Sequence, residues 1–160
     1  MKKLLCSLLF VFAGFSSFSQ EIKKVKIEDV VKMIDTSTTP LVINFWASWC
    51  QPCVHEIPWF EKITAEYKTQ GVKLVLVSLD FTADYKNKVL HQFVKKNNYT
   101  SQVVWLDETN ADKFCPLIDS SWGGSIPVTL MVNNQKKYRR FYEFQLKEER
   151  FKMELDKLVE

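Results

Sequence analysis

The sequence predicts an α/β fold in which a central mixed β-sheet is flanked by helices. Two near-continuous apolar runs, residues 41–47 and 72–79, have the length and composition of strands that are covered on both faces. Segments with helical spacing of apolar residues lie between the strands, as in sheets with parallel strands and helical connections. The last two predicted strands, 128–132 and 137–144, are joined by a short turn and add an antiparallel hairpin, so the sheet is mixed.

The first half of the chain is expected to alternate between strands and helices. In order, these elements are a strand at 22–27, a helix at 28–34, a strand at 41–47, a helix at 50–68 and a strand at 72–79. The longer helix is predicted from apolar residues that share one face, namely Ile57, Phe60, Ile63 and Tyr67. Gly71 is expected to end it.

The second half is expected to continue the alternation and to close with the hairpin and a helix. Its elements are a helix at 84–96, a strand at 103–106, a helix at 111–118, strands at 128–132 and 137–144, and a helix at 147–158. The helix at 84–96 is predicted from Val89, Phe93 and Val94, which lie near helical spacing. The hairpin turn is assigned to Asn133 and Asn134, because asparagine tolerates a positive φ.

The N-terminal residues have the pattern of a secretory signal peptide. Two lysines precede an apolar run over residues 4–18, and Ser17 and Ser19 are the small residues expected before a cleavage site. We therefore expect a signal peptide over 1–19 and one domain over 20–160. A membrane anchor is the alternative, but a run of about 15 residues is shorter than the roughly 20 that a spanning helix needs. Export would place the domain in a compartment such as the periplasm, where disulfides persist.

The charge of the chain argues against a nucleic-acid partner. The formal net charge is +3, and removal of residues 1–19 takes away two lysines and no acid, which leaves +1. The basic residues within 136–140 are expected to lie on a solvated strand edge, where they discourage pairing with another sheet.

The segment Cys50-Gln51-Pro52-Cys53 follows a buried strand and opens a helix. The partial positive charge and free N–H groups of a helix N-terminus favour a thiolate, which is the attacking form of cysteine. We therefore expect Cys50, at the tip of the helix, to be the exposed nucleophile that forms a mixed disulfide. Cys53, one turn inward, would then attack Cys50 and release the substrate.

Other uses of a Cys-x-x-Cys motif have weaker support. A structural zinc site needs four ligands, and Cys115, His55 and His91 are not paired at ligand spacing. Both histidines are expected on the surface. Haem attachment needs a histidine directly after the second cysteine, where this chain has Val54. A purely structural disulfide that closes a two-residue loop would add little stability. We expect neither a metal nor a cofactor.

Two segments resemble the signatures of the thioredoxin superfamily. Residues 45–53 (FWASWCQPC) are similar to its active-site motif, and residues 124–129 (GSIPVT) are similar to its second signature. The resemblance implies a thioredoxin fold with a cis peptide bond at Pro127 beside the cysteines, and backbone pairing of Ile126 with an extended substrate. The 74 positions between Cys53 and Pro127 leave room for an extra helix-strand insertion, as in the exported TlpA/ResA-like branch.

Glu56 lies three residues after Cys53 and resembles an acidic residue of the ResA-like proteins. The resemblance implies that it tunes the cysteine pair, and a carboxylate one turn from Cys53 could take its proton. Plain thioredoxins carry a buried aspartate in the strand before the motif, where this chain has Asn44, which cannot titrate. Glu56 is therefore the expected proton acceptor. The alternative is a solvated glutamate on the helix surface.

The tryptophans and the third cysteine of the domain complete the candidate site. Trp49 is expected on the surface beside Cys50 as a substrate contact, and Trp46 is expected to pack beneath the site. Trp122 precedes the Pro127 loop and would either contact substrate or pack in the interior. Cys115 is expected to be a buried thiol that acts as a small hydrophobic residue. A third redox thiol is its alternative role.

The resemblance implies a periplasmic disulfide reductase that acts on exported client proteins and receives electrons from a membrane donor. A disulfide oxidase or isomerase would use the same residues in the opposite direction. A thiol peroxidase would need a threonine three residues before its cysteine, where this chain has Ala47, and an arginine, none of which precedes Arg139. A non-enzymatic thioredoxin-like binding module would have no need of both cysteines.

Overall fold

The computed structural model describes residues 21–160, which form a six-stranded sheet with the strand order β1-β4-β3-β2-β5-β6. The strands are β1 (Lys23–Val25), β2 (Leu41–Trp46), β3 (Lys73–Ser78), β4 (Gln102–Leu106), β5 (Val128–Asn133) and β6 (Tyr138–Tyr142). The pairs β1–β4, β4–β3 and β3–β2 are parallel, and the pairs β2–β5 and β5–β6 are antiparallel. The predicted mixed sheet is therefore confirmed.

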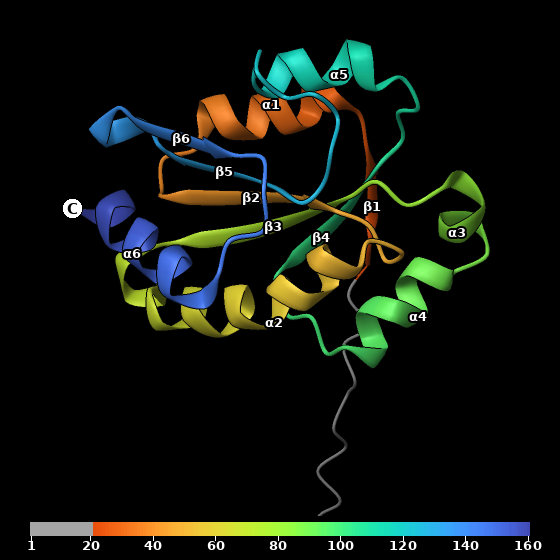
Figure 1. The fold of residues 1–160 in the computed structure, drawn as a ribbon, viewed down its shortest axis with the longest axis horizontal. Helices are drawn as coiled ribbons and strands as arrows, with labels where there is room; N and C mark the ends of the chain where they lie inside the picture. Colours follow the sequence, from red (N-terminus) through yellow and green to blue (C-terminus); the bar gives the residue numbers. More distant parts are fainter. Residues whose placement is uncertain (1–20) are drawn as a thin grey trace, which may run out of the picture.

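Helices cover both faces of this sheet. They are α1 (Ile27–Thr36), α2 (Gln51–Glu66), α3 (Thr82–Lys86), α4 (Val89–Lys96), α5 (Ala111–Ile118) and α6 (Glu148–Val159), with the 3-10 turns η1 (Lys68–Gln70) and η2 (Asn134–Lys136). α1 and α5 lie on one face, and α2, α4 and α6 lie on the other (Figure 1). The predicted α/β arrangement of a sheet between helical layers is thus also confirmed.

The sheet separates two hydrophobic cores. The core beneath α2 and α6 contains Trp46, Phe60 and Phe151, and the rings of Phe60 and Phe151 stack with their centroids 3.8 Å apart. Phe45 belongs to the core beneath α1 and α5. Neighbouring residues of β2 thus face opposite cores, as the alternation of side chains along a strand requires. This explains why residues 41–47 are apolar throughout.

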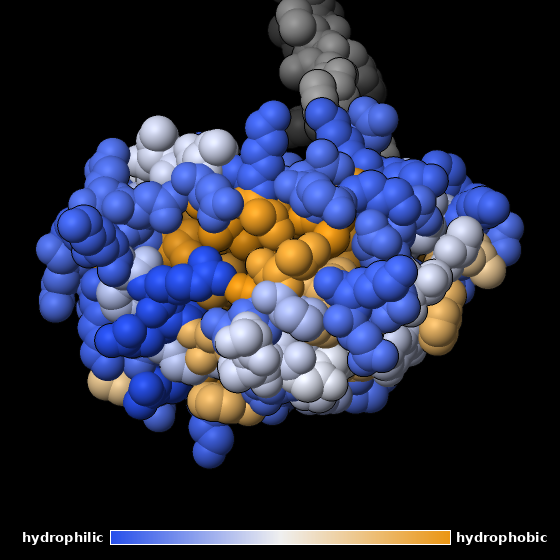
Figure 2. Space-filling model, turned by 90° about the horizontal axis from the view of Figure 1, so that it is seen from above, coloured by the Kyte–Doolittle hydropathy of each residue, from blue (hydrophilic) through white to orange (hydrophobic). Residues whose placement is uncertain are grey.

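The face that carries α1 and α5 has an apolar hollow bordered by hydrophilic side chains (Figure 2). Leu117 of α5 is 53% exposed. This face lies across the sheet from α2, the helix that carries the cysteine motif.

The segment between the cysteine motif and Pro127 contributes the strand β4, which pairs with both β3 and β1. The predicted extra helix-strand insertion is confirmed by this strand and the helices before it. The predicted signal peptide over 1–19 lies outside the described residues. Within residues 21–160, no helix is long and apolar enough to cross a membrane.

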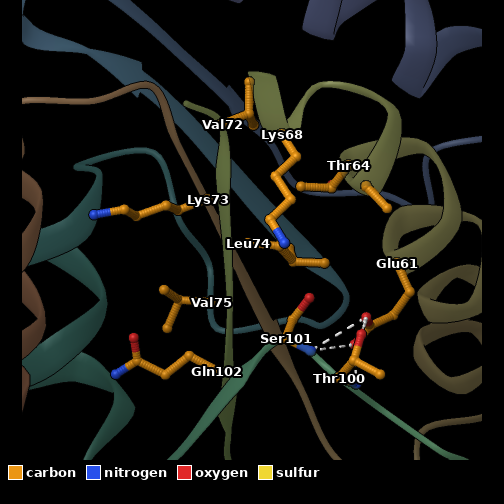
Figure 3. Close-up of a pocket in the computed structure, with 11 residues that line it drawn as sticks. Glu61, Thr64, Lys68, Val72, Lys73, Leu74, Val75, Thr100, Ser101 and Gln102 are labelled. Carbon is orange, nitrogen blue, oxygen red and sulfur yellow. Dashed lines mark hydrogen bonds between the residues drawn. The ribbon is translucent and has the colours of Figure 1, made fainter. Parts of the chain in front are cut away.

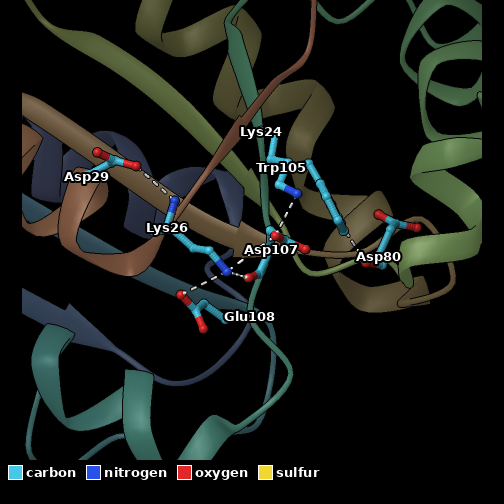
Figure 4. A network of polar contacts seen from close by, with 7 residues as sticks. All are labelled: Lys24, Lys26, Asp29, Asp80, Trp105, Asp107 and Glu108. Carbon is cyan, nitrogen blue, oxygen red and sulfur yellow. Dashed lines mark hydrogen bonds and ion pairs between the residues drawn. The ribbon is translucent and has the colours of Figure 1, made fainter.

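The edge strand β1 is attached to the end of β4 by charged side chains (Figure 4). The Nζ atoms of Lys24 and Lys26 lie 2.8 and 3.2 Å from the carboxylate of Asp107. Lys24 also lies over the ring of Trp105, 5.8 Å from its centroid. The indole Nε1 of Trp105 donates to the Asp80 carbonyl at 2.8 Å. Exposed ion pairs contribute little stability, but this set fixes the position of β1 beside the segment that follows β3.

The prediction of one helix over 84–96 is wrong. The chain forms α3 and α4, and Lys88 between them has a φ of +62°. Tyr85 of α3 stacks on Trp105 with ring centroids 4.1 Å apart, whereas Leu90 of α4 is fully buried in the core beneath α2. Tyr85 packs against the same core as Leu90, so each of the two short helices directs one side chain to it.

The hairpin between β5 and β6 also differs from the expectation. Its positive φ occurs at Lys137 (+52°), after η2, and not at Asn133 or Asn134. The side-chain amide of Asn134 instead donates to the Ile34 carbonyl at 2.8 Å. Asn134 therefore binds the end of α1 rather than supplying the left-handed residue of the turn.

Candidate active site

The cysteine pair lies where β2 ends and α2 begins. Cys50 is the N-cap of α2, and its N–H donates to the Ala47 carbonyl at 3.0 Å. Pro52 occupies the first turn, where a missing N–H removes no helical hydrogen bond. The sulfurs of Cys50 and Cys53 form a disulfide, so the structure shows the oxidised state. Cys50 is 6% exposed and Cys53 is 0% exposed. Cys50 is therefore the more exposed of the two cysteines, as expected, but it is itself largely buried.

The loop before β5 reaches this disulfide. The Ile126–Pro127 peptide bond is cis, as the resemblance implied. The carbonyl oxygen of Ile126 lies 3.8 Å from Sγ of Cys50. Ile126 is half-buried and Pro127 is buried. The structure therefore brings together Cys50, Ile126 and Pro127, which are far apart in the sequence.

Glu56 is a fully buried carboxyl group on the turn of α2 that follows Cys53. Its Oε1 accepts a hydrogen bond from Asn44 Nδ2, and its Oε2 accepts one from the Leu146 N–H, both at 2.9 Å. Burial raises the pKa of Glu56 to about 7, and the two hydrogen bonds, which favour the charged form, offset this only in part. The alternative of a solvated surface glutamate is wrong. Glu56 can gain or lose a proton near neutral pH.

The amide of Asn44 connects this carboxyl group to the strand after the cis proline. Besides Glu56, its Nδ2 lies 3.1 Å from Oγ1 of Thr129 and 3.4 Å from the Val128 carbonyl oxygen. Asn44 and Thr129 are direct partners in the β2–β5 register, and both are fully buried. One side chain therefore couples the position of the Glu56 carboxyl group to β5, directly after Pro127.

Glu56 should make the stability of the oxidised protein depend on pH. Its folded-state pKa of about 7 lies above its ordinary value of 4.5, so the folded protein binds this proton more tightly than the unfolded chain. The resulting stabilisation is complete below about pH 4.5 and is lost as pH rises through about 7, which amounts to about 3 kcal/mol. Relative to a Glu56→Gln variant, the wild type should therefore lose about 3 kcal/mol of unfolding free energy between about pH 4 and pH 8. Urea denaturation at each pH measures this difference, and parallel pH curves for the two proteins would contradict it.

A second buried carboxylate, Asp80, holds the segment before the cysteines. It lies two residues after β3 and is 4% exposed. Its oxygens accept hydrogen bonds from the Ser48 N–H at 3.1 and 3.2 Å, from the Ser48 hydroxyl, and from the Ser78 hydroxyl at 2.7 Å. Sequence analysis missed this residue, although Ser78 and Asp80 are polar residues at the end of an apolar strand. Asp80 fixes the backbone that leads to Trp49 and Cys50.

Trp49 is 51% exposed beside Cys50, as expected. Its ring stacks on that of Phe81, with centroids 5.7 Å apart and an interplanar angle of 19°. Trp46 is fully buried and contacts Tyr99 edge-on, with ring centroids 5.6 Å apart. The exposed aromatic surface at the site is therefore formed by Trp49 together with Phe81, a residue that sequence analysis did not single out.

A family model described as the AhpC/TSA family matches residues 12–141. The chain belongs to the AhpC/TSA family. It is 36% identical over 84 residues to the thiol-disulfide oxidoreductase ResA of Oceanobacillus iheyensis, an alignment that covers 52% of this chain and 42% of that protein. It is 27% identical over 134 residues to ResA of Bacillus subtilis, with 79% and 69% of the two chains covered. The chain thus spans less than half the length of the first of these relatives.

The structure of this AhpC/TSA-family chain is also similar to the crystal structure of StoA from Bacillus subtilis. The TM-score is 0.57 with 25% sequence identity, over 79% of this chain and 87% of that one. The thioredoxin fold and the place of the chain within the TlpA/ResA-like proteins of the thioredoxin superfamily are therefore confirmed.

Trp122 has a packing role in this AhpC/TSA-family chain. It is 5% exposed, and its ring lies 4.7 Å from that of Phe45. Its Nε1 donates to the Ser125 carbonyl at 2.8 Å, which stabilises the loop before the cis proline.

Of the two predicted surface histidines, His55 is exposed, but His91 is half-buried against Tyr85. The surface prediction therefore holds for His55, whereas His91 is only partly exposed.

Cys115 is separated from the redox pair by the sheet. It is 2% exposed in the core beneath α1 and α5, whereas Cys50 and Cys53 belong to the core beneath α2. Burial raises the pKa of the Cys115 thiol to about 11. A buried, protonated thiol is unreactive, so the structure supports the small-hydrophobe role and gives no geometry for a third redox thiol.

A cleft of about 450 Å³ lies at the other end of the sheet, between α2 and the first residues of β3 and β4 (Figure 3). Lys68 and Lys73 line it, and the carboxylate of Glu61 at its rim accepts hydrogen bonds from the N–H groups of Thr100 and Ser101. The cysteines follow the carboxyl end of β2, whereas this cleft adjoins the amino ends of β3 and β4. The cleft is therefore not part of the candidate active site.

Proposed function

We propose that this chain is a thiol-disulfide oxidoreductase that reduces disulfides of exported client proteins through Cys50 and Cys53. The observation that carries the proposal is the Cys50–Cys53 disulfide at the N-terminus of α2, with the carbonyl of Ile126 3.8 Å from Sγ of Cys50. The names of the ResA relatives support the reaction type. The export of the protein rests on the signal peptide expected over 1–19.

The first step is an attack by the Cys50 thiolate of the reduced protein on one sulfur of a client disulfide. A bond forms between Sγ of Cys50 and that sulfur, the client S–S bond breaks, and the other client sulfur leaves as a thiolate that takes a proton from water. The N-terminus of α2 favours the Cys50 thiolate through its free N–H groups and partial positive charge. The Ile126 carbonyl lies beside the sulfur and Trp49 directly precedes Cys50 in the chain, and we assign both residues and Pro127 to client binding.

The second step releases the client. The Cys53 thiol gives its proton to the carboxylate of Glu56, and the Cys53 thiolate attacks Sγ of Cys50. The Cys50–Cys53 disulfide forms, the mixed disulfide breaks, and the second client sulfur leaves as a thiolate and takes a proton. The client has then gained two electrons from the cysteine pair and two protons from water, and the proton that Cys53 gave up is held by Glu56. A pKa of about 7 suits Glu56 to this exchange at neutral pH.

Another round requires two electrons for the Cys50–Cys53 disulfide. We assign this role to a dithiol of a membrane donor, because an exported protein is separated from the reductants of the cytoplasm. The direction of electron flow is decided by the reduction potential of the cysteine pair relative to its partners.

The midpoint potential of the Cys50–Cys53 pair tests this direction. The purified protein is equilibrated in dithiothreitol or glutathione buffers of known potential, and the oxidised fraction is measured after the thiols are trapped. We expect a midpoint at or below about −250 mV, near that of thioredoxin. A midpoint above about −180 mV would instead assign the protein as a disulfide oxidase or isomerase.

A thiol peroxidase is a weaker candidate for the same site. Ala47, three residues before Cys50, is fully buried and carries no hydroxyl group. The guanidinium of Arg139 donates to the Ile118 carbonyl at the end of α5. Neither residue supplies the threonine and arginine contacts that a peroxide-reducing cysteine would use. A binding module without redox chemistry would have no need of a buried carboxyl group on the turn that follows Cys53.

A further inference from the structure

The Trp49–Phe81 pair is an apolar surface next to the redox disulfide. Trp49 is 51% exposed and Phe81 is 64% exposed, although the two rings stack on each other. Trp49 directly precedes Cys50 in the chain, so the aromatic pair adjoins the residue that carries the attacking sulfur. Contiguous exposed aromatic side chains at a reactive group are typical of a binding surface, because their burial by a partner removes apolar area from water.

The backbone on both sides of the stack is held in place. Before Trp49, the Ser48 N–H donates to the carboxylate of Asp80, the residue before Phe81. The Leu79 N–H donates to the Trp46 carbonyl at 2.7 Å, so the loops after β2 and β3 are joined at a second point. The two rings are therefore positioned before any partner binds, and little conformational entropy is lost when one does.

We propose that Phe81, together with Trp49, selects client segments that carry a large apolar side chain one or two residues from the reacting cysteine. This inference rests on the proposed function, since it places the client cysteine at Sγ of Cys50. An extended chain advances about 3.3 Å per residue, so a residue next to that cysteine reaches the rings beside Cys50. Phe81 adds a second apolar face to the surface that Trp49 alone would offer.

The buried carboxylate next to the stack is already engaged within the protein. Asp80, next to Phe81 in the chain, is 4% exposed, and its oxygens already accept hydrogen bonds from Ser48 and Ser78. This carboxylate is thus not available to pair with a lysine of the client. The two exposed rings offer a client side chain apolar area to bury.

Three peptides test the selectivity. They are identical except for the residue after their single cysteine, which is leucine, serine or lysine, and the cysteine is joined to glutathione by a disulfide. The second-order rate constant for reduction by the reduced protein should be at least about fivefold larger for the leucine peptide than for the serine peptide. In Phe81→Ser this ratio should fall towards one. A ratio compares two substrates of one protein, so a general loss of activity cancels.

Leu117→Ser is the matched control, because Leu117 is 53% exposed on α5, across the sheet from α2. It should keep the wild-type ratio. Circular dichroism checks that Phe81→Ser, which truncates an exposed side chain, is folded. Equal wild-type constants for leucine and serine, a preference for lysine, or an unchanged ratio in Phe81→Ser would overturn the inference.

A binding measurement separates this inference from the proposed function. The same peptides with serine in place of cysteine are titrated into the oxidised protein by calorimetry. Tighter binding of the leucine form, lost in Phe81→Ser, supports the inference even if no peptide disulfide is reduced, a result that would contradict the proposed function alone. Equal binding of both forms, together with normal reduction of glutathione disulfide, would overturn the inference and leave the proposed function intact.

Discussion

Replacement of Cys50 by serine is expected to lower disulfide reduction to the uncatalysed rate, whereas Cys53→Ser is expected to stop the reaction at the mixed disulfide. Cys50 is the N-cap of α2 and the more exposed of the two cysteines, so it is the sulfur that a client can reach. Cys53 is fully buried and can attack only Cys50. Without Cys53 the first bond still forms, but no thiolate is present to break it.

Mass spectrometry of the reduced variants after incubation with a disulfide peptide distinguishes these outcomes. Cys53→Ser should gain the mass of the peptide at Cys50, and Cys50→Ser should gain none. Cys115→Ser is the control, since its thiol lies in the core on the other side of the sheet, and its turnover should match that of the wild type. Accumulation of the adduct on Cys50→Ser rather than Cys53→Ser would reverse the two roles.

Glu56→Gln is expected to slow the resolution of the mixed disulfide by about 10²-fold at neutral pH, the usual size of a general-base effect. In the wild type the rate should rise with pH as the carboxyl group ionises, with a midpoint near its pKa of about 7. In the variant, Cys53 must lose its proton to water, so the rise should move to the pH at which the thiol itself ionises.

Stopped-flow measurement of peptide release from a preformed mixed disulfide yields this pH profile. Glu66→Gln is a matched control, because Glu66 is an exposed glutamate on the same helix and pairs only weakly, at 3.6 Å, with Lys152. Its profile should coincide with that of the wild type. A Glu56→Gln profile that also coincides would mean that the carboxyl group has no part in proton transfer.

The sheet was predictable from sequence because its central strands carry their own signal. The residues of β2 and β3 are apolar on both faces of the sheet, and such a run can be recognised in the sequence without knowing which strands it pairs with. The break at Lys88 was not predictable, since no glycine or proline marks it. Tyr85 of α3 and Leu90 of α4 both pack against the core beneath α2 and α6, and such tertiary contacts override helical periodicity.

The site was predictable only where one local motif holds its residues. Cys50, Cys53 and Glu56 share one helix start, and the proline of the second signature was expected beside them by resemblance. The contacts of Asp80 with Ser48 and of Asn44 with Thr129 depend on which strands are neighbours and in which register. A shift of register by one residue would change every such pair, and the sequence does not determine the register directly.

The position of Cys115 allows local unfolding of the oxidised protein to be measured through the alkylation of this one thiol. With Cys50 and Cys53 joined, Cys115 is the free cysteine of the described residues, and it lies on the buried face of α5 with a thiol whose pKa is about 11. An alkylating reagent can modify it only when α5 moves away from the sheet. The rate at which a mass increase appears at Cys115 therefore measures how often this layer opens, with no engineered probe.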